Sequence, residues 1–539
     1  MIEWLKTAVF YEVFPPSFKD SDADGIGDLP GIIEKLDYIR ELGCSALWLN
    51  PCFLSPFKDA GYDVEDYYRI APRYGTNEDA RKLFDEAHRR GMHVLLDLVP
   101  GHTSVTHPWF LKSCEPEPNE YWGRYVWNDS QDKPLPVGFE YGIAGALRGI
   151  SDRPGTVATN CFSTQPALNY GFADVTDPEW MMRPEDPEPM KTRKAILDVC
   201  VFWRKMGCDG FRVDMASSLV KKDDMNRTAN IRLWKAMRAY LDEQVPGTAL
   251  VSEWGRPAQS LNAGFDMDFF LHFLPCYQAL FRAETPFFSR GGKGDAKAFV
   301  DFYEETAAKI PEGGLMCMVT GNHDMPRIAW KLDPEELKLA YSFIFALPGA
   351  PFLYYGDEIG MRYIENLTSR EGAFGRAGSR TPMQWDSSAD CGFSSAPQDM
   401  LYFPTDPDPA RPDAAAQAAD PQSVFSTLKR ILSVRGTLAA MENTAGIDFI
   451  FAEDHRCPLV FVRTPNPPEK RCAGAGTSEG AVLVAVNPSE KEITVTARDF
   501  RRDPGLSRFR KTVLSVGAGA FADAGKLVIH PLSAAWISE

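Results

Sequence analysis

Short apolar runs recur along the first two thirds of the chain, and helix-like stretches separate them. Near-continuous apolar strands that alternate with helices indicate a parallel sheet buried on both faces. Eight βα units are what closure into a (β/α)₈ barrel requires, so we predict a TIM barrel within the α/β class. The expected strands are Val9–Val13, Ala46–Leu49, Val94–Val99, Gly210–Asp214, Ala249–Glu253, the weaker Gly264–Met267, Leu315–Thr320 and Pro351–Tyr355.

The stretch after residue 75 illustrates the helices between these strands. Leu83, Phe84 and Ala87 recur at helical spacing. Asn is a residue type that caps helix N-termini, and Gly is a type that follows helix C-termini. We therefore expect a helix that is capped by Asn77 and ends near Gly91.

Two regions depart from the alternation and predict further domains. About ninety residues rich in Trp, Tyr, Asn and Pro follow the third strand. A βα loop of that length in a barrel is usually a functional lobe over the active face. From about residue 445 the pattern changes to alternating strands, which predicts a small β-sandwich. We assign residues 1–100 and 191–444 to the barrel (domain A), 101–190 to an inserted domain B after strand 3, and 445–539 to a C-terminal β-sandwich (domain C).

The bulk composition narrows the range of partners. A formal net charge of −16 disfavours a nucleic-acid backbone as partner. No apolar run approaches the ~20 residues that span a bilayer, and no signal-peptide pattern opens the sequence. The eleven cysteines form no CxxC pair, and reduced, mostly buried thiols are the simplest interpretation. We expect a cytoplasmic protein that binds a small neutral ligand and neither nucleic acid nor membrane. The oligomeric state stays open.

Charged and polar residues follow several predicted strands, at the edge where barrel enzymes place their chemistry. One such residue alone would more often be a surface charge or a member of a structural ion pair. Polar residues after four separate apolar strands favour a shared site instead. They are Asp97, His102, Arg212, Asp214, Glu253, His323 and Asp324.

This set of residue types suits glycoside cleavage. Two carboxyl groups with different pKa values are sufficient, because one attacks the anomeric carbon and the other protonates the leaving oxygen. Arg212 and Asp214 lie two residues apart on one strand, so their side chains point to the same face. We expect Arg212 to hold the Asp214 carboxylate ionised and oriented. Histidines could donate hydrogen bonds to sugar hydroxyls.

Four ordered motifs give these residues a family context. The motifs 97-DLVPGHTS-104, 210-GFRVDMA-216, 252-SEWG-255 and 321-GNHDMPR-327 resemble those of glycoside hydrolase family 13, the α-amylase family. Supporting matches are 61-GYD-63, 165-QPALN-169 and 353-LYYGDEIGM-361. The runs 18-FKDSDADGIGDLPGIIEKLDYI-39 and 380-RTPMQWD-386 are most similar to the branch of oligo-1,6-glucosidases, α-glucosidases and trehalose synthases.

The resemblance implies roles for individual residues. Asp214 resembles the nucleophile, Glu253 the general acid/base and Asp324 the third carboxylate, which grips sugar hydroxyls. Tyr62 would stack on the glucose just before the scissile bond. The same subsite would also be lined by Asp97, His102, Arg212 and His323.

A further match concerns the mode of attack. Asp59 and Arg380 match a pair that closes the pocket around the non-reducing end in the glucosidase branch. The expected function is a retaining, exo-acting α-glucosidase on maltose-, isomaltose- or sucrose-like oligosaccharides, working through a β-glucosyl-enzyme. The alternative on this scaffold is a trehalose synthase-like isomerase or an α-glucosyltransferase, because only the fate of the glucosyl-enzyme differs. A non-catalytic binding protein would be expected to lack the carboxylates.

An acidic loop predicts a metal site. Its oxygen ligands would be the side chains of Asp20, Asp22, Asp24 and Asp28 with the backbone carbonyl of Ile26, which suit a hard cation. A solvated acidic turn is the alternative. Similarity to the calcium loop of the glucosidase branch favours a structural Ca²⁺, and no organic cofactor is expected.

Three residues depart from the family pattern. Gly101 replaces an Asn that is a calcium ligand in α-amylases, so we expect their interdomain calcium site to be absent. Met215 follows the nucleophile where Val often accompanies α-1,6 cleavage and Thr α-1,4 cleavage. Ala167 replaces an acidic residue in the QPxLN motif. The linkage specificity therefore stays open.

Overall fold

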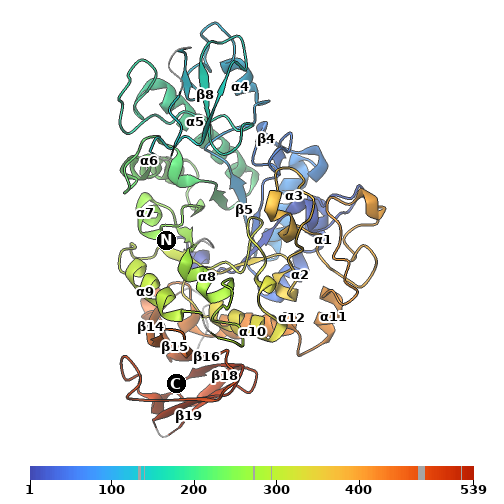
Figure 1. Cartoon of the computed structure of the whole chain (residues 1–539), viewed down its shortest axis with the longest axis vertical. Coiled ribbons are helices and arrows are strands. Elements are labelled where there is room, and N and C mark those ends of the chain that lie inside the picture. Colours follow the sequence, from blue (N-terminus) through green and yellow to red (C-terminus); the bar gives the residue numbers. More distant parts are fainter. Residues whose placement is uncertain (131–134, 139, 271–273, 293, 472–479, 524) are drawn as a thin grey trace.

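The chain forms three parts that follow one another along its longest axis. The computed structural model describes residues 1–539 except 131–134, 139, 271–273, 293, 472–479 and 524. Figure 1 shows the insert with α4 (Pro108–Ser113) and β8 (Thr156–Thr159) at the top and the C-terminal strands at the bottom. The barrel lies between them.

Eight parallel strands succeed one another around the central sheet in chain order. A parallel bridge between Val319 and Phe352 joins the segment after the seventh strand to the eighth and completes the ring. The predicted TIM barrel is confirmed, and almost every strand residue is buried, as expected for a sheet covered on both faces. The strands are β1 (Phe10–Val13), β2 (Ala46–Leu49), β5 (His93–Leu98), β9 (Gly210–Val213), β10 (Ala249–Ser252), β11 (Met267–Phe269), β12 (Leu315–Cys317) and β13 (Phe352–Tyr354).

Helices surround this sheet. α5 begins at Pro187, so the predicted end of domain B at residue 190 falls within the first turn of that helix. None of the helices in the described part of the chain combines the length and the apolar character needed to cross a bilayer. The helices are α1 (Leu29–Glu34), α2 (Leu36–Leu42), α3 (Asn77–Arg89), α5 (Pro187–Met206), α6 (Thr228–Gln244), α7 (Pro257–Ser260), α8 (Pro275–Phe281), α9 (Ala296–Ala307), α10 (Pro334–Ile344), α11 (Ala414–Ala419) and α12 (Val424–Thr437).

Two local predictions were wrong. The weak strand at Gly264–Met267 is β11 at Met267–Phe269, because Gly264 is left-handed (φ 102°) and ends a 3₁₀ turn before the strand can start. The cap of α3 is Thr76 and not Asn77. The Thr76 hydroxyl accepts from the Asp79 backbone N–H, and the Asp79 carboxylate accepts from the Thr76 N–H in return.

Domain B contributes a small antiparallel sheet over the barrel. In this sheet β8 lies between β6 (Trp127–Asn128) and β7 (Gly145–Arg148). In the chain all three strands lie between β5 and α5. The segment after β8 returns to the barrel, where Ala167 forms a bridge with His102. A short hairpin, β3 (Phe53–Leu54) and β4 (Asp66–Ile70), lies between β2 and α3 in the chain.

Domain C is the predicted β-sandwich. Buried side chains of both sheets, such as Val460, Leu483, Leu527 and Ile529, form one core between them. The Trp536 indole donates to the carbonyl of Ser342 on α10 (3.1 Å), which ties the sandwich to the barrel. Its larger sheet orders β14 (Gly446–Glu453), β15 (Arg456–Thr464), β16 (Val482–Asn487), β21 (Ser533–Ser538) and β18 (Lys511–Val516), and the smaller orders β17 (Ile493–Thr496), β20 (Lys526–Ile529) and β19 (Ala520–Asp523).

Candidate functional site

Arg212 on β9 connects three carboxyl groups at the ends of neighbouring strands. Its Nη1 donates to Asp97 Oδ1 (2.9 Å) and to Asp214 Oδ1 (3.1 Å). Its Nη2 lies 3.0 Å from Glu253 Oε2. Because β5, β9 and β10 are adjacent in the sheet, the residues that end them meet at one edge of the barrel. The structure thus brings together four of the predicted site residues.

Asp214 and Glu253 form an interacting pair. Burial raises the pKa of Asp214 well above its usual range, and the charge of Glu253 raises it further, while Arg212 acts to lower it. Arg212 contacts Asp214 directly, and its charge opposes the effect of burial on the Asp214 pKa. The Asp214 side chain is 9% exposed and that of Glu253 26%. The two carboxyl groups thus share one guanidinium but differ in their exposure to solvent.

Met215 links the two strand ends through its backbone. Its φ of 42° lies in the left-handed region, which costs a non-glycine residue about 1–3 kcal/mol. In this conformation the Met215 N–H donates to Glu253 Oε2 (3.0 Å). The residue after Asp214 therefore helps to orient the Glu253 carboxyl group.

Asp97 holds Tyr62 in place from the base of the site. Its Oδ2 accepts from the Tyr62 hydroxyl and from the Trp48 indole, both at 3.1 Å. Burial raises the pKa of Asp97 to about 6, against the opposing effect of Arg212. Asp97 is 2% exposed, and its carboxylate contacts Arg212, Tyr62 and Trp48.

His102 supports the same tyrosine from domain B. Burial lowers the pKa of His102 to about 3, so the ring is neutral. The Asn160 amide nitrogen lies 3.0 Å from Nδ1 of His102. Nε2 of His102 lies 3.0 Å from the Tyr62 carbonyl oxygen. With Asn160 as donor to Nδ1, the ring proton is on Nε2 and is donated to Tyr62. Both ring nitrogens thus have protein partners.

Asp324 is clamped by two arginines. Its Oδ1 accepts from Arg376 (2.8 Å) and from Arg380 (2.9 Å). Burial acts to raise the pKa of Asp324, but His323, Arg380 and Arg376 outweigh it and hold the pKa below the usual range. The guanidinium groups of Arg380 and Arg376 both contact Asp324 directly and favour its ionised form. The Asp324 side chain is 25% exposed.

His323 lies between polar groups that the sequence analysis did not select. Its Nδ1 is 2.8 Å from Glu12 Oε1 and 3.1 Å from the Asn50 amide nitrogen. Its Nε2 is 2.7 Å from the Tyr62 hydroxyl. Glu12 is fully buried on β1, and a charged residue inside an otherwise apolar strand is the signal that could have identified it. Asn50 directly follows β2 and carries the same kind of signal.

The partner of Asp59 is a residue that sequence reasoning missed. Asp59 Oδ1 accepts from Arg376 (3.3 Å), and Oδ2 accepts from Gln165 of domain B (2.7 Å). Arg380, the residue matched with Asp59 in the sequence, bonds to Asp324 and to the His323 carbonyl instead. Arg376 therefore joins Asp59 to Asp324. Arg376 lies in a 3₁₀ turn, Phe374–Ser379, just before the 380-RTPMQWD-386 run and outside every motif, so no motif marks it.

The acidic loop brings part of the predicted metal-ligand set together. Carboxylate oxygens of Asp20, Asp22 and Asp28 lie within 4.8 Å of one another. Asp24 is outside this group, and its carboxylate accepts from the Ile26 N–H (2.8 Å). Burial, opposed in part by hydrogen bonds, raises the pKa of Asp28, and the charge of Asp22 contributes. A hard cation fits this set of three carboxylates.

Comparison with known proteins identifies the family. A model of the alpha-amylase catalytic domain matches residues 12–444. The chain belongs to the α-amylase family, glycoside hydrolase family 13. It is therefore an enzyme, a glycoside hydrolase.

Relatives of this α-amylase-family enzyme include an oligo-1,6-glucosidase and a trehalose synthase/amylase. It is 30% identical to an oligo-1,6-glucosidase from Parageobacillus thermoglucosidasius, over 80% of the chain and 83% of the relative. It is 31% identical to "Trehalose synthase/amylase TreS" of Mycolicibacterium smegmatis, over 80% and 76%. The trehalose-6-phosphate hydrolase of Bacillus licheniformis shares the fold (TM-score 0.79, 24% identity, 99% of both chains).

Proposed function

We propose that the enzyme is a retaining, exo-acting α-glucosidase that removes single glucose units from short neutral α-glucosides. The observation that carries the proposal is the contact of one guanidinium, that of Arg212, with both Asp214 and Glu253. An α-glucosidase-type activity is supported by the family and by the named relatives.

The reaction would proceed in two steps. Asp214 attacks the anomeric carbon while protonated Glu253 transfers its proton to the leaving oxygen, which breaks the glycosidic bond and forms a β-glucosyl ester. Glu253, now ionised, takes a proton from water, which attacks the same carbon and releases α-glucose and free Asp214. The configuration is retained because each step inverts it once.

The separation of the carboxyl groups favours this route. Retaining glycosidases hold them about 5–5.5 Å apart, whereas inverting enzymes leave about 6.5–9.5 Å for a water molecule. Asp214 Oδ1 and Glu253 Oε2 lie 3.1 Å and 3.0 Å from the two terminal nitrogens of one rigid, planar group. Asp214 also lies within hydrogen-bond reach of Glu253, and this short separation supports the retaining mechanism.

Exo-action would follow from the network around Asp324. Arg376 and Gln165 hold Asp59, and Arg376 and Arg380 hold Asp324. These fixed carboxylates can accept hydrogen bonds from the hydroxyls of a terminal glucose. We propose that they close the pocket around the non-reducing end, so that no further sugar unit fits beyond the terminal glucose.

An isomerase or glucosyltransferase is the second candidate. The similarity to the M. smegmatis trehalose synthase/amylase favours it. In that reaction a second sugar, and not water, would receive the glucosyl group from Asp214. The same carboxylates would do the chemistry, so product analysis has to separate the two activities.

Early products provide that separation. The enzyme is incubated with maltose, isomaltose, sucrose or trehalose, and the products are followed by proton NMR from the first minutes, with the Asp214→Asn variant as blank. We expect α-glucose as the first product, and the relative rates would identify the preferred linkage. β-Glucose as the first product from sucrose, whose only glucose unit is the one cleaved at its anomeric carbon, would contradict retention. A new disaccharide with little free glucose would replace the hydrolase proposal by the transferase.

We also propose that the acidic loop binds a structural Ca²⁺. Asp20, Asp22 and Asp28 would supply carboxylate oxygens, and the ion would relieve their mutual repulsion. Gly25 in this loop is left-handed (φ 88°), and a Cβ there would lie 2.3 Å from the Met400 carbonyl oxygen. The loop is thereby packed against the segment around Met400 and would transmit the stabilisation to the barrel.

Removing calcium should lower the melting temperature. An ion present at 100 times its Kd stabilises the folded state by about 2.7 kcal/mol, so chelation should lower the Tm by several degrees. The exposed residue Asp22 permits a matched control. Asp22→Asn should fold normally, but its Tm should differ little between calcium and chelator. Calorimetry measures the Tm of both proteins. If chelation lowers the Tm of the parent and of Asp22→Asn equally, this loop is not the calcium site.

Finally, we propose that the enzyme works in the cytoplasm. The ten cysteines that the structure describes are all free, and seven of them are buried. Free thiols are typical of proteins from reducing compartments. Recovery of the enzyme in an extracellular or periplasmic fraction would contradict this proposal.

A further inference from the structure

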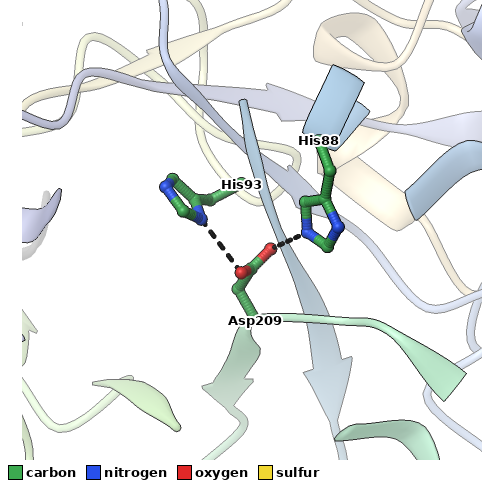
Figure 2. A group of neighbouring side chains, drawn as sticks. All are labelled: His88, His93 and Asp209. Atoms are coloured by element: carbon green, nitrogen blue, oxygen red, sulfur yellow. Dashed lines mark hydrogen bonds and ion pairs between the residues drawn. The ribbon is translucent and has the colours of Figure 1, made fainter. Parts of the chain in front are cut away.

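Three side chains of types that can ligate metals meet near the starts of β5 and β9 (Figure 2), whereas the catalytic groups lie at the other ends of these strands. The three side chains are His88 in the last turn of α3, His93 at the start of β5 and Asp209 just before β9. His88 Nε2 lies 2.9 Å from Asp209 Oδ2, and His93 Nδ1 lies 2.9 Å from Asp209 Oδ1. The catalytic ends of the same two strands are marked by Asp97 and Asp214, about 13 Å or more away at roughly 3.3 Å per strand residue.

The backbone and an aromatic ring hold this cluster in position. Asp209 Oδ2 also accepts from the Val94 backbone N–H (2.8 Å). The His93 ring stacks on Trp4, with centroids 4.1 Å apart and planes inclined by 12°. The side chains of His88, His93 and Asp209 are 39%, 29% and 15% exposed. The cluster is therefore preorganised and accessible to an ion from solvent.

We infer that His88, His93 and Asp209 form a binding site for a divalent transition-metal ion of the zinc class. All three ligand atoms lie within 4.8 Å of one another. Two imidazole nitrogens and one carboxylate oxygen are a donor set that suits Zn²⁺, with water as the fourth ligand. The acidic loop, in contrast, offers only oxygen donors, which suit Ca²⁺. The two sites would thus differ in the metal that they select.

The ion would take the place of the protons that now lie between the two histidines and Asp209. Without metal, His88 Nε2 and His93 Nδ1 point their N–H groups at Asp209. With metal, the same nitrogens present lone pairs to the ion, and each ring keeps its proton on the other nitrogen. A ring that was doubly protonated releases one proton to solvent, so binding weakens as the pH falls. The ion would join α3 to β5 and β9 and stabilise the barrel without entering the reaction.

The simpler alternative is a hydrogen-bonded clamp in which Asp209 only accepts from the two histidines. His88→Gln separates the two possibilities, because the amide can still donate to Asp209 but is a poor metal ligand. The matched control is His530→Gln in domain C, since His530 lies 3.1 Å from Glu492 in a pair with a single histidine.

The experiment is a titration of the chelator-treated, calcium-saturated enzyme with ZnCl₂ by calorimetry. We expect one Zn²⁺ per chain, a higher Tm on binding, and an absorption spectrum of tetrahedral Co²⁺ when cobalt replaces zinc. His88→Gln and His93→Ala should each weaken binding by at least about 10–100-fold, the range seen when only a group that supports a metal ligand is lost. His530→Gln should bind as the parent does. Absence of one-to-one binding, or cluster variants that bind Zn²⁺ as tightly as the parent enzyme does, would overturn the inference.

Discussion

Replacing Asp214 by Asn should lower kcat by about four to six orders of magnitude, the scale seen when a catalytic nucleophile is removed. The amide cannot form the glucosyl ester, and Arg212 loses one of its three carboxylate contacts. The substitution keeps the size of the side chain, so the Tm should change little. Initial rates on maltose and thermal unfolding of the same preparation measure the two effects.

Azide provides a sharper test of the same role. In Asp214→Gly a small anion can enter the space left by the carboxylate and attack the anomeric carbon from that face. An α-glucosyl fluoride, which needs no acid to leave, should then give β-glucosyl azide. Asp97→Asn is the matched control, because Asp97 contacts the same Arg212 but would not touch the sugar. It should lose activity that azide does not restore. If Asp214→Asn kept more than about 1% of the parent kcat, Asp214 would not be the nucleophile.

The barrel and its catalytic edge could be predicted because both have local signals. Seven of the apolar runs became strands close to their predicted positions, since a strand buried on both faces has to be apolar throughout. Asp97, Asp214 and Glu253 then lie together because each ends one of three adjacent strands. Chain order in a barrel is also order in space, so sequence alone was sufficient for this part of the site.

The remaining part of the site depends on tertiary folding. Arg376 reaches Asp59 and Asp324 from a 3₁₀ turn that lies outside every motif, so no spacing could indicate it. The left-handed backbone of Met215 depends on the packing around it, since Met has no intrinsic preference for that conformation. Glu12 was visible in principle as a charge within an apolar strand, but its contact with His323 joins residues 311 positions apart.

Replacing Glu253 by Gln should affect substrates according to their leaving groups. Maltose needs a proton on the departing oxygen, and we expect its turnover to fall about 10²–10⁴-fold, the usual contribution of a general acid. An α-glucoside of a good leaving group, such as 2,4-dinitrophenol, departs without that proton and should still glucosylate Asp214. Deglucosylation also needs Glu253, so the glucosyl-enzyme should accumulate. Intact-mass spectrometry would detect it as the addition of one hexosyl group to the chain.

A control variant and the anomer of the azide product test the role of Glu253 further. Glu12→Gln is the matched variant, because Glu12 is buried behind His323 and should influence both substrates to a similar extent. In Glu253→Gln azide would attack the β-glucosyl-enzyme and give α-glucosyl azide, the opposite anomer to that expected from Asp214→Gly. Opposite anomers from the two variants would place the two carboxyl groups on opposite faces of the sugar, as double displacement requires. The same anomer from both, or equal losses on both leaving groups, would contradict the acid/base role of Glu253.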